Sequence, residues 1–212
     1  MSKVQTNQKA PITGFENINR YWDQENQTVT AKLMPGDYYV TDQDEMITTV
    51  LGSCVAACIR DSVTGVGGMN HFMLPETSED RLSARDEAVV GNALRYGNYA
   101  MEHLINSILR NGGKRKNLEV KLFGGGKIIA TLGDVGAKNI KFVLDYVDTE
   151  ALTLVSQDLG DIYPRKVNFF PRTGRVRMKK IKDLHNQTIF LREKQYSSSI
   201  KDAPVEGSVE LF

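Results

Sequence analysis

The chain has 212 residues, 41% of them hydrophobic, so it is long enough to bury the core of one domain. Its 27 Lys and Arg residues nearly balance its 26 Asp and Glu residues, which gives no electrostatic reason to expect nucleic acid or an anionic membrane as a partner. The sequence contains no apolar run long enough to span a bilayer and does not begin with the apolar stretch of a secretory signal. We therefore expect a cytoplasmic protein without membrane insertion.

Three segments are expected along the chain. Residues 1–33 are mostly polar and predict an N-terminal extension, partly flexible, whose apolar residues could dock as a short helix: Phe15, Ile18, Tyr21 and Trp22. Residues 34–194 alternate between β-like and helical patterns and predict one domain. Residues 195–212 are rich in Ser, charge and turn formers and predict a flexible C-terminal tail.

Within the domain the hydrophobic spacing predicts two helices and several strands. Helices are expected over 86–111, with a buried stripe that includes Met101, Leu104 and Ile108, and over 136–149. Strands are expected over 48–51, 55–60, 66–74, 118–123, 152–156, 166–170 and 175–181. This pattern predicts an α+β fold, a layered sandwich of mixed or antiparallel sheet with helices on the outside.

The chain has two cysteines, Cys54 and Cys58, and such a sparse pair argues against a disulfide framework in a reducing compartment. Cys54 follows a Gly52-Ser53 pair that interrupts β-like sequence, whereas Cys58 falls inside a predicted strand. Gly52 allows a sharp turn there, so that the amides of Ser53 and Cys54 could point into one space as an oxyanion hole. Cys54 is therefore the candidate nucleophile, and Cys58 is interpreted as a core residue.

A thiol attacks as thiolate, and a neighbouring imidazole is the commonest acceptor of its proton. The predicted strands 55–60 and 66–74 are joined by a turn-rich segment, so we expect a hairpin. Folding about Val63 places Val55 opposite His71, and His71 then lies near Cys54 at the open end of the hairpin. His71 is thus the candidate base. Its orienting group could be Thr48 or, less favourably, Asn70, which should point to the opposite face of the strand.

Other chemistry-bearing residues have simpler interpretations. His103 and His185 are interpreted as surface histidines, and the sequence lacks the Cys and His spacing of a zinc site, so no metal is expected. The run Gly124-Gly125-Gly126-Lys127 lacks the spacing of phosphate-binding loops and indicates a tight turn or close backbone packing beside the site. The basic residues in and just before the last predicted strand are interpreted as a solvated strand face rather than a nucleic-acid patch: Arg172, Arg175, Arg177, Lys179 and Lys180.

Several longer motifs resemble one known family. They are Leu51-Gly52-Ser53-Cys54-Val55-Ala56, residues 67–75 (GGMNHFMLP), residues 95–102 (RYGNYAME), residues 121–126 (KLFGGG), residues 163–166 (YPRK) and residues 169–175 (FFPRTGR). Together they resemble CheD, the chemoreceptor glutamine deamidases, and the resemblance covers about Met34 to Ile181.

The resemblance implies a Cys-His-Thr triad, with Cys54 as nucleophile, His71 as base and Thr48 as third member. It also implies a layered sandwich akin to deamidating bacterial toxins, methyl-accepting chemoreceptors as substrates, and in many cases a CheC-type phosphatase as partner. No metal or organic cofactor is required. We expect a cysteine-dependent amidohydrolase that converts receptor glutamine to glutamate through a thioester.

Other functions are also compatible with these residues. The same acyl-enzyme chemistry could cleave a glutamyl methyl ester. The protein could instead be chiefly a receptor-binding or CheC-binding module with minor catalysis. A cysteine protease or a transglutaminase would share the nucleophile but would need a peptide-binding cleft or a site for an amine.

Overall fold

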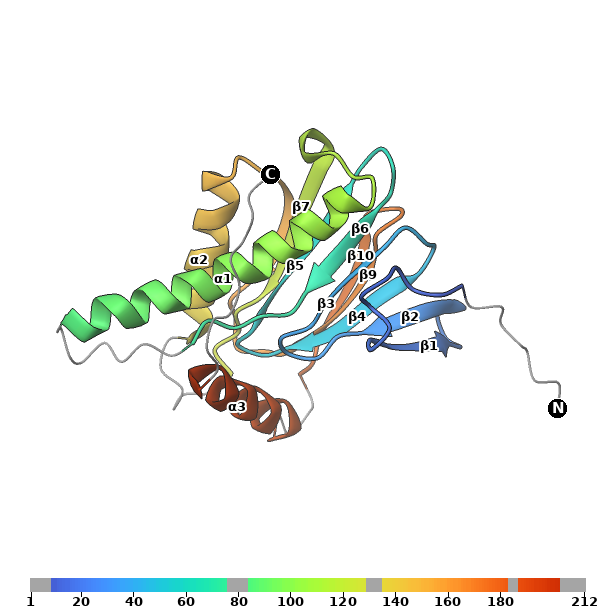
Figure 1. Cartoon of the computed structure of the whole chain (residues 1–212). Helices are drawn as coiled ribbons and strands as arrows, with labels where there is room; N and C mark the ends of the chain where they lie inside the picture. Colours follow the sequence, from blue (N-terminus) through green and yellow to red (C-terminus); the bar gives the residue numbers. More distant parts are fainter. Residues whose placement is uncertain (1–8, 76–83, 129–134, 183–186, 203–212) are drawn as a thin grey trace.

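The computed structural model describes residues 9–75, 84–128, 135–182 and 187–202 (Figure 1). Its helices are α1 (Ala84–Arg110), α2 (Val135–Thr149) and α3 (Gln187–Asp202), with a short 3-10 turn at Arg115–Asn117. Its strands are β1 (Asn19–Asp23), β2 (Thr28–Lys32), β3 (Tyr38–Thr41), β4 (Met46–Leu51), β5 (Val55–Asp61), β6 (Gly67–Asn70), β7 (Leu118–Gly124), β8 (Thr153–Leu159), β9 (Arg165–Phe170) and β10 (Arg175–Lys180).

In the described part of the chain the strands form two five-stranded sheets, in the orders β1-β2-β4-β9-β10 and β3-β6-β5-β7-β8. Each sheet is mixed, because β2 pairs parallel with β4 and β7 pairs parallel with β8. The fold is therefore α+β, and the predicted fold class is confirmed. No helix among the described residues is long and apolar enough to cross a membrane.

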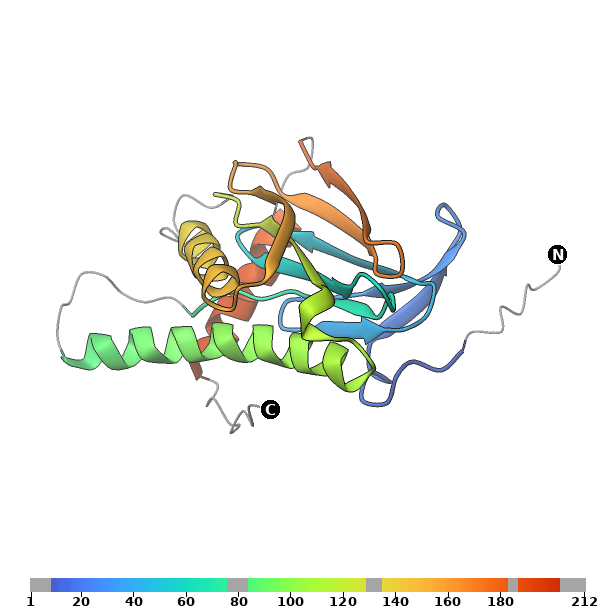
Figure 2. The ribbon, with the colours of Figure 1, turned by 90° about the horizontal axis from the view of Figure 1, so that it is seen from above.

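Helices α1 and α2 lie together on the sheet that contains β5 and β6 (Figures 1 and 2). The predicted stripe of α1 is buried, since Met101, Leu104 and Ile108 have no exposed surface. Helix α2 buries Asn139 and Val143 on the same side of the sheet. Helix α3 stands apart from this layer, at the end of the strands where β4 turns into β5 (Figure 1).

The prediction of a short helix near the N-terminus is wrong. Tyr21 and Trp22 belong to β1, which pairs antiparallel with β2. Aromatic residues favour strands, and this hairpin adds two strands to the first sheet, where Arg20 forms an ion pair with buried Glu45 at 3.0 Å. The residues expected to form an extension thus contribute strands to the body of the fold.

The hairpin of β5 and β6 is confirmed, but its predicted register is wrong by one residue. Cys58 pairs with Met69 and Val55 with Phe72, which places Ala56 opposite His71. Side chains two residues apart share a face of a strand, so Cys54 and His71 become diagonal neighbours on one face. The expected register would have placed them on opposite faces.

Candidate active site

Cys54 lies where the chain passes from one sheet to the other. Strand β4 of the first sheet ends at Leu51, and β5 of the second sheet begins at Val55. Residues 52–54 form the turn between them, as the Gly-Ser interruption predicted. The turn is buried, with Cys54 fully enclosed. A change of sheet within three residues requires tight backbone packing, which the neighbouring glycines provide.

The carbonyl oxygens of this turn accept hydrogen bonds from residues outside the turn. Those of residues 52, 53 and 54 accept hydrogen bonds from the Gly126 amide, the Asn139 side-chain nitrogen and the Gly125 amide, at 2.8, 2.9 and 2.8 Å. Gly125 has φ +67°, a conformation in which a side chain would be strained. The glycine run therefore packs its backbone beside the site, as interpreted from the sequence.

Arg165 donates hydrogen bonds to the backbone beside this glycine run. Its side chain is fully buried and donates to the carbonyl oxygens of Gly124 and Gly160 at 2.6 Å, and it pairs with Asp158 at 3.0 Å. A buried guanidinium is tolerated only when paired and hydrogen-bonded in this way. Its position in the chain gave no sign of this role, because Arg165 lies 41 residues from Gly124.

With their carbonyls engaged, the amides of the turn point together to the opposite side. They bind the carboxylate of Glu193 on α3: Oε1 accepts from the amides of Gly52 at 2.7 Å and Cys54 at 3.3 Å. Oε2 accepts from the Ser53 amide at 2.8 Å and the Ser53 hydroxyl at 2.6 Å. The turn therefore forms an anion-binding nest of preorganised donors, the arrangement predicted for an oxyanion hole.

His71 faces this turn with a defined tautomer. Its Nδ1 lies 2.8 Å from the hydroxyl oxygen of Thr49, and that hydroxyl donates its single proton to the carbonyl of Leu33 at 3.0 Å. The Thr49 oxygen must therefore accept from Nδ1, so Nδ1 carries the proton and Nε2 carries the lone pair. Nε2 is buried and has no hydrogen-bond partner.

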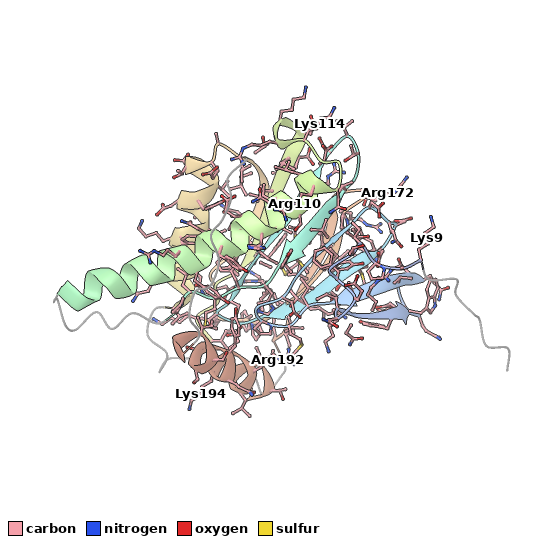
Figure 3. All side chains as sticks on the ribbon, viewed as in Figure 1. Lys9, Arg110, Lys114, Arg172, Arg192 and Lys194 are labelled. Atoms are coloured by element: carbon pink, nitrogen blue, oxygen red, sulfur yellow. The ribbon has the colours of Figure 1, made fainter. Side chains whose placement is uncertain are left out.

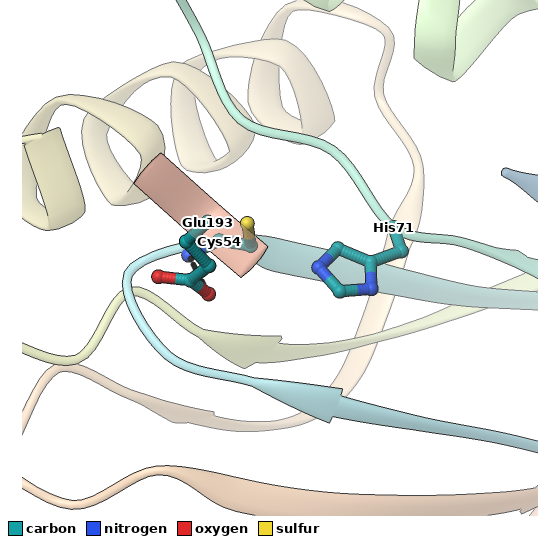
Figure 4. Close-up of side chains that lie close together, drawn as sticks. All are labelled: Cys54, His71 and Glu193. Carbon is teal, nitrogen blue, oxygen red and sulfur yellow. Dashed lines mark hydrogen bonds between the residues drawn. The ribbon is translucent and has the colours of Figure 1, made fainter. Parts of the chain in front are cut away.

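Cys54, His71 and Glu193 converge on one point (Figure 4). The Cys54 sulfur, a His71 ring nitrogen and a Glu193 carboxylate oxygen lie within 4.8 Å of one another, and Figure 4 shows a ring nitrogen of His71 turned toward the other two side chains. The structure thus brings together the predicted nucleophile, the predicted base and the predicted turn. It adds Glu193, which the sequence analysis did not single out.

Thr48 does not take the position expected of it. Its hydroxyl bonds the Val167 carbonyl at 3.2 Å and the Asn168 side-chain oxygen at 2.6 Å, across the β4–β9 pairing. Consecutive residues of a strand point to opposite faces, so when Thr49 faces His71, Thr48 faces away. The contact expected between Thr48 and His71 is corrected to one between Thr49 and His71.

Asn70 also takes no part in orienting the imidazole. Its side-chain oxygen accepts from the Ala57 amide at 2.8 Å, and its nitrogen donates to the Ala100 carbonyl on α1 at 3.1 Å. Asn70 thus connects the hairpin to α1 from the other face of the strand, as its place beside His71 predicted. His103 lies against the rings of Tyr38 and Tyr99, and His185 falls outside the described residues.

Both candidate groups, the Cys54 thiol and the His71 imidazole, are neutral in this arrangement. Burial lowers the pKa of His71 to about 3, so the imidazole is an unprotonated base at neutral pH. Burial and then the negative charge of Glu193 raise the pKa of Cys54 well above its ordinary value, so the sulfur is a thiol. The site therefore holds a thiol close to an imidazole whose Nε2 has no hydrogen-bond partner.

Among the described residues, Cys54, His71 and Glu193 form the one group of three or more Cys, His, Asp or Glu side chains whose ligand atoms lie close enough together to bind one metal ion. A thiolate, an imidazole and a carboxylate are ligands that zinc accepts. Both Glu193 oxygens, however, already accept hydrogen bonds from the turn, and Nδ1 of His71 is held by Thr49. The hydrogen bonds alone therefore account for how these side chains are placed.

Comparison with known proteins gives one consistent result. Residues 73–180 match the family model described as CheD chemotactic sensory transduction. Relatives named probable chemoreceptor glutamine deamidase CheD include those of Halorhodospira halophila (53% identical, 95% of this chain and 93% of the relative) and Methylobacillus flagellatus (53%, 95% and 98%). The relative of the same name from Saccharophagus degradans is 48% identical over 100% of this chain and 97% of its own.

Proposed function

Because the chain belongs to the CheD family, we propose that it is a chemoreceptor glutamine deamidase, which hydrolyses glutamine side chains of chemoreceptors to glutamate. One observation of the site carries this proposal. The buried Cys54 thiol lies beside an imidazole with a free lone pair and beside three amides that already hold a glutamate carboxylate. A glutamate side chain is the product of the proposed reaction.

The first half of the reaction forms a thioester. His71 Nε2 takes the thiol proton of Cys54, and the sulfur attacks the amide carbon of the substrate glutamine. The oxygen of that amide becomes an oxyanion, which the amides of Gly52 and Cys54 stabilise from the positions in which they hold Glu193 Oε1. The imidazolium then protonates the leaving nitrogen, the C–N bond breaks, and ammonia departs.

The second half returns the enzyme to its starting state. His71 takes a proton from water, the hydroxide attacks the thioester carbon, and the same amides stabilise the second oxyanion. The C–S bond then breaks, and the sulfur recovers its proton from the imidazolium. The products are a glutamate side chain and the Cys54 thiol, with no cofactor in any step.

Thr49 is proposed to position His71 during both halves. Its hydroxyl accepts from Nδ1 and is itself fixed by the Leu33 carbonyl, so the imidazole can rotate little and keeps Nε2 toward Cys54. The hydrogen bond also stabilises the imidazolium that forms after proton transfer. Thr48, the residue that the family resemblance assigned to this role, lies on the other face of β4.

The wider setting is proposed on the same basis. The protein would act in the cytoplasm, on the cytoplasmic helices of methyl-accepting receptors, and would use a CheC-type phosphatase as partner. Conversion of glutamine to glutamate adds a negative charge to a receptor helix and so increases repulsion between neighbouring helices. A glutamyl methyl ester would pass through the same thioester and is proposed as a slower side substrate.

The reaction is tested by incubating the cytoplasmic domain of a chemoreceptor with the protein in ordinary water and in water enriched in ¹⁸O. Peptide mass spectrometry should show conversion of specific glutamines to glutamate, with ¹⁸O entering the new carboxylate and equimolar ammonia released. Chain cleavage would indicate a protease, and amine incorporation a transglutaminase. Unmodified receptor that nevertheless binds the protein would indicate the binding module instead.

Asn139 offers a separate test of the preorganised turn. Asn139→Ala removes the bond to the Ser53 carbonyl and the bond from the Leu74 amide, so the turn should lose alignment. We expect kcat for deamidation to fall roughly tenfold and the free energy of unfolding to fall by about 1–3 kcal/mol. Lys141→Ala, an exposed change on the same helix, is the control for both measurements. An unchanged kcat in the Asn139 variant would contradict the role of this anchor.

A further inference from the structure

The site is closed in this structure. Cys54 has no exposed surface and His71 is 1% exposed, although the proposed reaction requires a receptor side chain to reach both. The carboxylate of Glu193, which α3 carries, lies within 4.8 Å of the Cys54 sulfur and of a His71 ring nitrogen. Helix α3 therefore places a charged side chain against the two groups that a substrate must reach.

One face of helix α3 packs against the rest of the protein. Ile189, Glu193 and Ser197, spaced four residues apart, are all buried, with Glu193 1% exposed in the centre. On the other face, Leu191 is 61% exposed and Gln195 is also exposed. Figure 3 labels Arg192 and Lys194, the two cationic neighbours of Glu193, on this helix.

The body of the protein offers α3 a surface without side chains at two points. A Cβ on Gly52 would lie 2.6 Å from a Glu193 oxygen, and a Cβ on Gly36 would lie 2.9 Å from the ring of Tyr196. The hydroxyl of Tyr196 also contacts the hydroxyl of Tyr96 on α1. We call this surface, formed by Gly36, residues 52–54 and Tyr96, the α3-binding surface.

The hydrogen bonds at its centre distinguish a carboxylate from an amide. Each Glu193 oxygen accepts from at least one backbone amide, and an amide N–H can only donate. A glutamine side chain has one acceptor oxygen, so its NH₂ group would face the Ser53 amide without a hydrogen bond. The pocket in this state thus matches the product of deamidation better than the substrate.

We infer that α3 is an intramolecular mimic of the product complex, and that the α3-binding surface is where a receptor helix docks to present its glutamine to Cys54. The inference rests on the proposed function. Helix α3 shows that this surface accepts an α-helix whose central side chain enters the turn, with the positions one turn before and after it also buried. A receptor helix must displace α3 to react, so α3 competes with the substrate.

The charge of Glu193 also acts on the Cys54 thiol. Its carboxylate is one of the causes that raise the pKa of Cys54, after burial. When α3 leaves, both the negative charge and part of the burial are removed, so the thiol should ionise more readily beside His71. Displacement of α3 would therefore expose the nucleophile and activate it in one movement.

The test compares the full-length protein with its Glu193→Ala variant, using iodoacetamide as the probe. We expect alkylation of Cys54, followed by peptide mass spectrometry, to be roughly tenfold or more faster in the variant, because the charged hydrogen bonds that hold α3 are lost. Alkylation of Cys58, enclosed in β5, serves as the internal reference and should stay slow. Gln195→Ala, a change on the exposed face of α3, should react like the original protein.

Kinetics with a receptor domain extend the test. Relief of competition should lower KM for the receptor in Glu193→Ala while kcat is retained. Glu193→Gln keeps the shape of the side chain and should give an intermediate alkylation rate, which guards against a folding defect in the alanine variant; circular dichroism checks both folds.

Equal alkylation of Cys54 in all variants would overturn the inference, as would a folded Glu193→Ala protein that has lost the deamidation that the original protein performs. Faster alkylation of Cys54 in Glu193→Ala, with no deamidation of any receptor by either the variant or the original protein, would instead retain the role of α3 as a cover and reject the proposed function. The two hypotheses therefore fail in different arms of the experiment.

Discussion

Replacement of Cys54 by alanine is expected to reduce the deamidation rate by about a thousandfold or more. The proposed mechanism forms its only covalent bond between enzyme and substrate through this sulfur, and without the thioester the remaining amides and imidazole can only assist a direct attack by water. The side chain of Cys54 is small and buried, so alanine should fit the same space. The rate is measured by mass spectrometry of a receptor cytoplasmic domain and by release of ammonia.

Cys58→Ala is the matched control. Cys58 is also buried and lies four residues away, but it belongs to the regular part of β5 and contacts no other candidate site residue by hydrogen bond in the described structure. Its loss should cost about 1 kcal/mol of folding free energy and leave kcat nearly unchanged. Equal loss of activity in the two variants would show that the effect of Cys54→Ala is structural and would reject Cys54 as nucleophile.

Replacement of Thr49 by valine is expected to reduce kcat by about 10- to 100-fold. Valine has nearly the shape of threonine but cannot accept from Nδ1 of His71, so the imidazole loses the contact that sets its tautomer and its orientation. Thr49→Ser keeps the hydroxyl and should retain most of the activity. Steady-state kinetics with a receptor domain measure the effect, and KM should change little because Thr49 lies behind the imidazole.

Thr48→Val tests whether Thr49, as proposed here, or Thr48, as the family resemblance implies, orients His71. The change removes the bonds to Val167 and Asn168 and should cost about 1 kcal/mol of stability, with kcat close to that of the original protein. A loss of activity in Thr48→Val that matched or exceeded that in Thr49→Val would restore Thr48 as the third member of the site. Thermal unfolding of each variant, measured in parallel, shows whether any loss comes from instability.

We propose that the turn binds an anion both during the reaction and in the closed state. In the proposed reaction the amides of Gly52 and Cys54 stabilise an oxyanion for a short time, whereas in the closed state all three turn amides bind the permanent charge of Glu193. The same donors serve both because they are held from behind by the glycine run and by Asn139. Preorganised donors need no rearrangement when charge develops, which is the physical advantage of building the turn between two sheets.

The sequence alone was sufficient for features that depend on local pattern. Hydrophobic spacing located α1 and α2 and most strands of the two sheets, because burial repeats with the period of each element. The Gly-Ser interruption before Cys54 located the turn, and a single imidazole with strand neighbours indicated His71 as its partner. The family resemblance rested on the same residues and added the expected reaction.

Only the tertiary structure decided the features that depend on a register or on residues distant in the chain. A shift of one residue in the β5–β6 pairing, and the alternation of side chains along β4, determine that His71 faces Cys54 and that Thr49 rather than Thr48 contacts the ring. The contact of Glu193 with the turn joins residues 140 positions apart, and α3 crosses position 195, where a flexible tail was expected to begin. Local composition carries no information on such contacts, because their energy arises only when the packed chain brings the partners together.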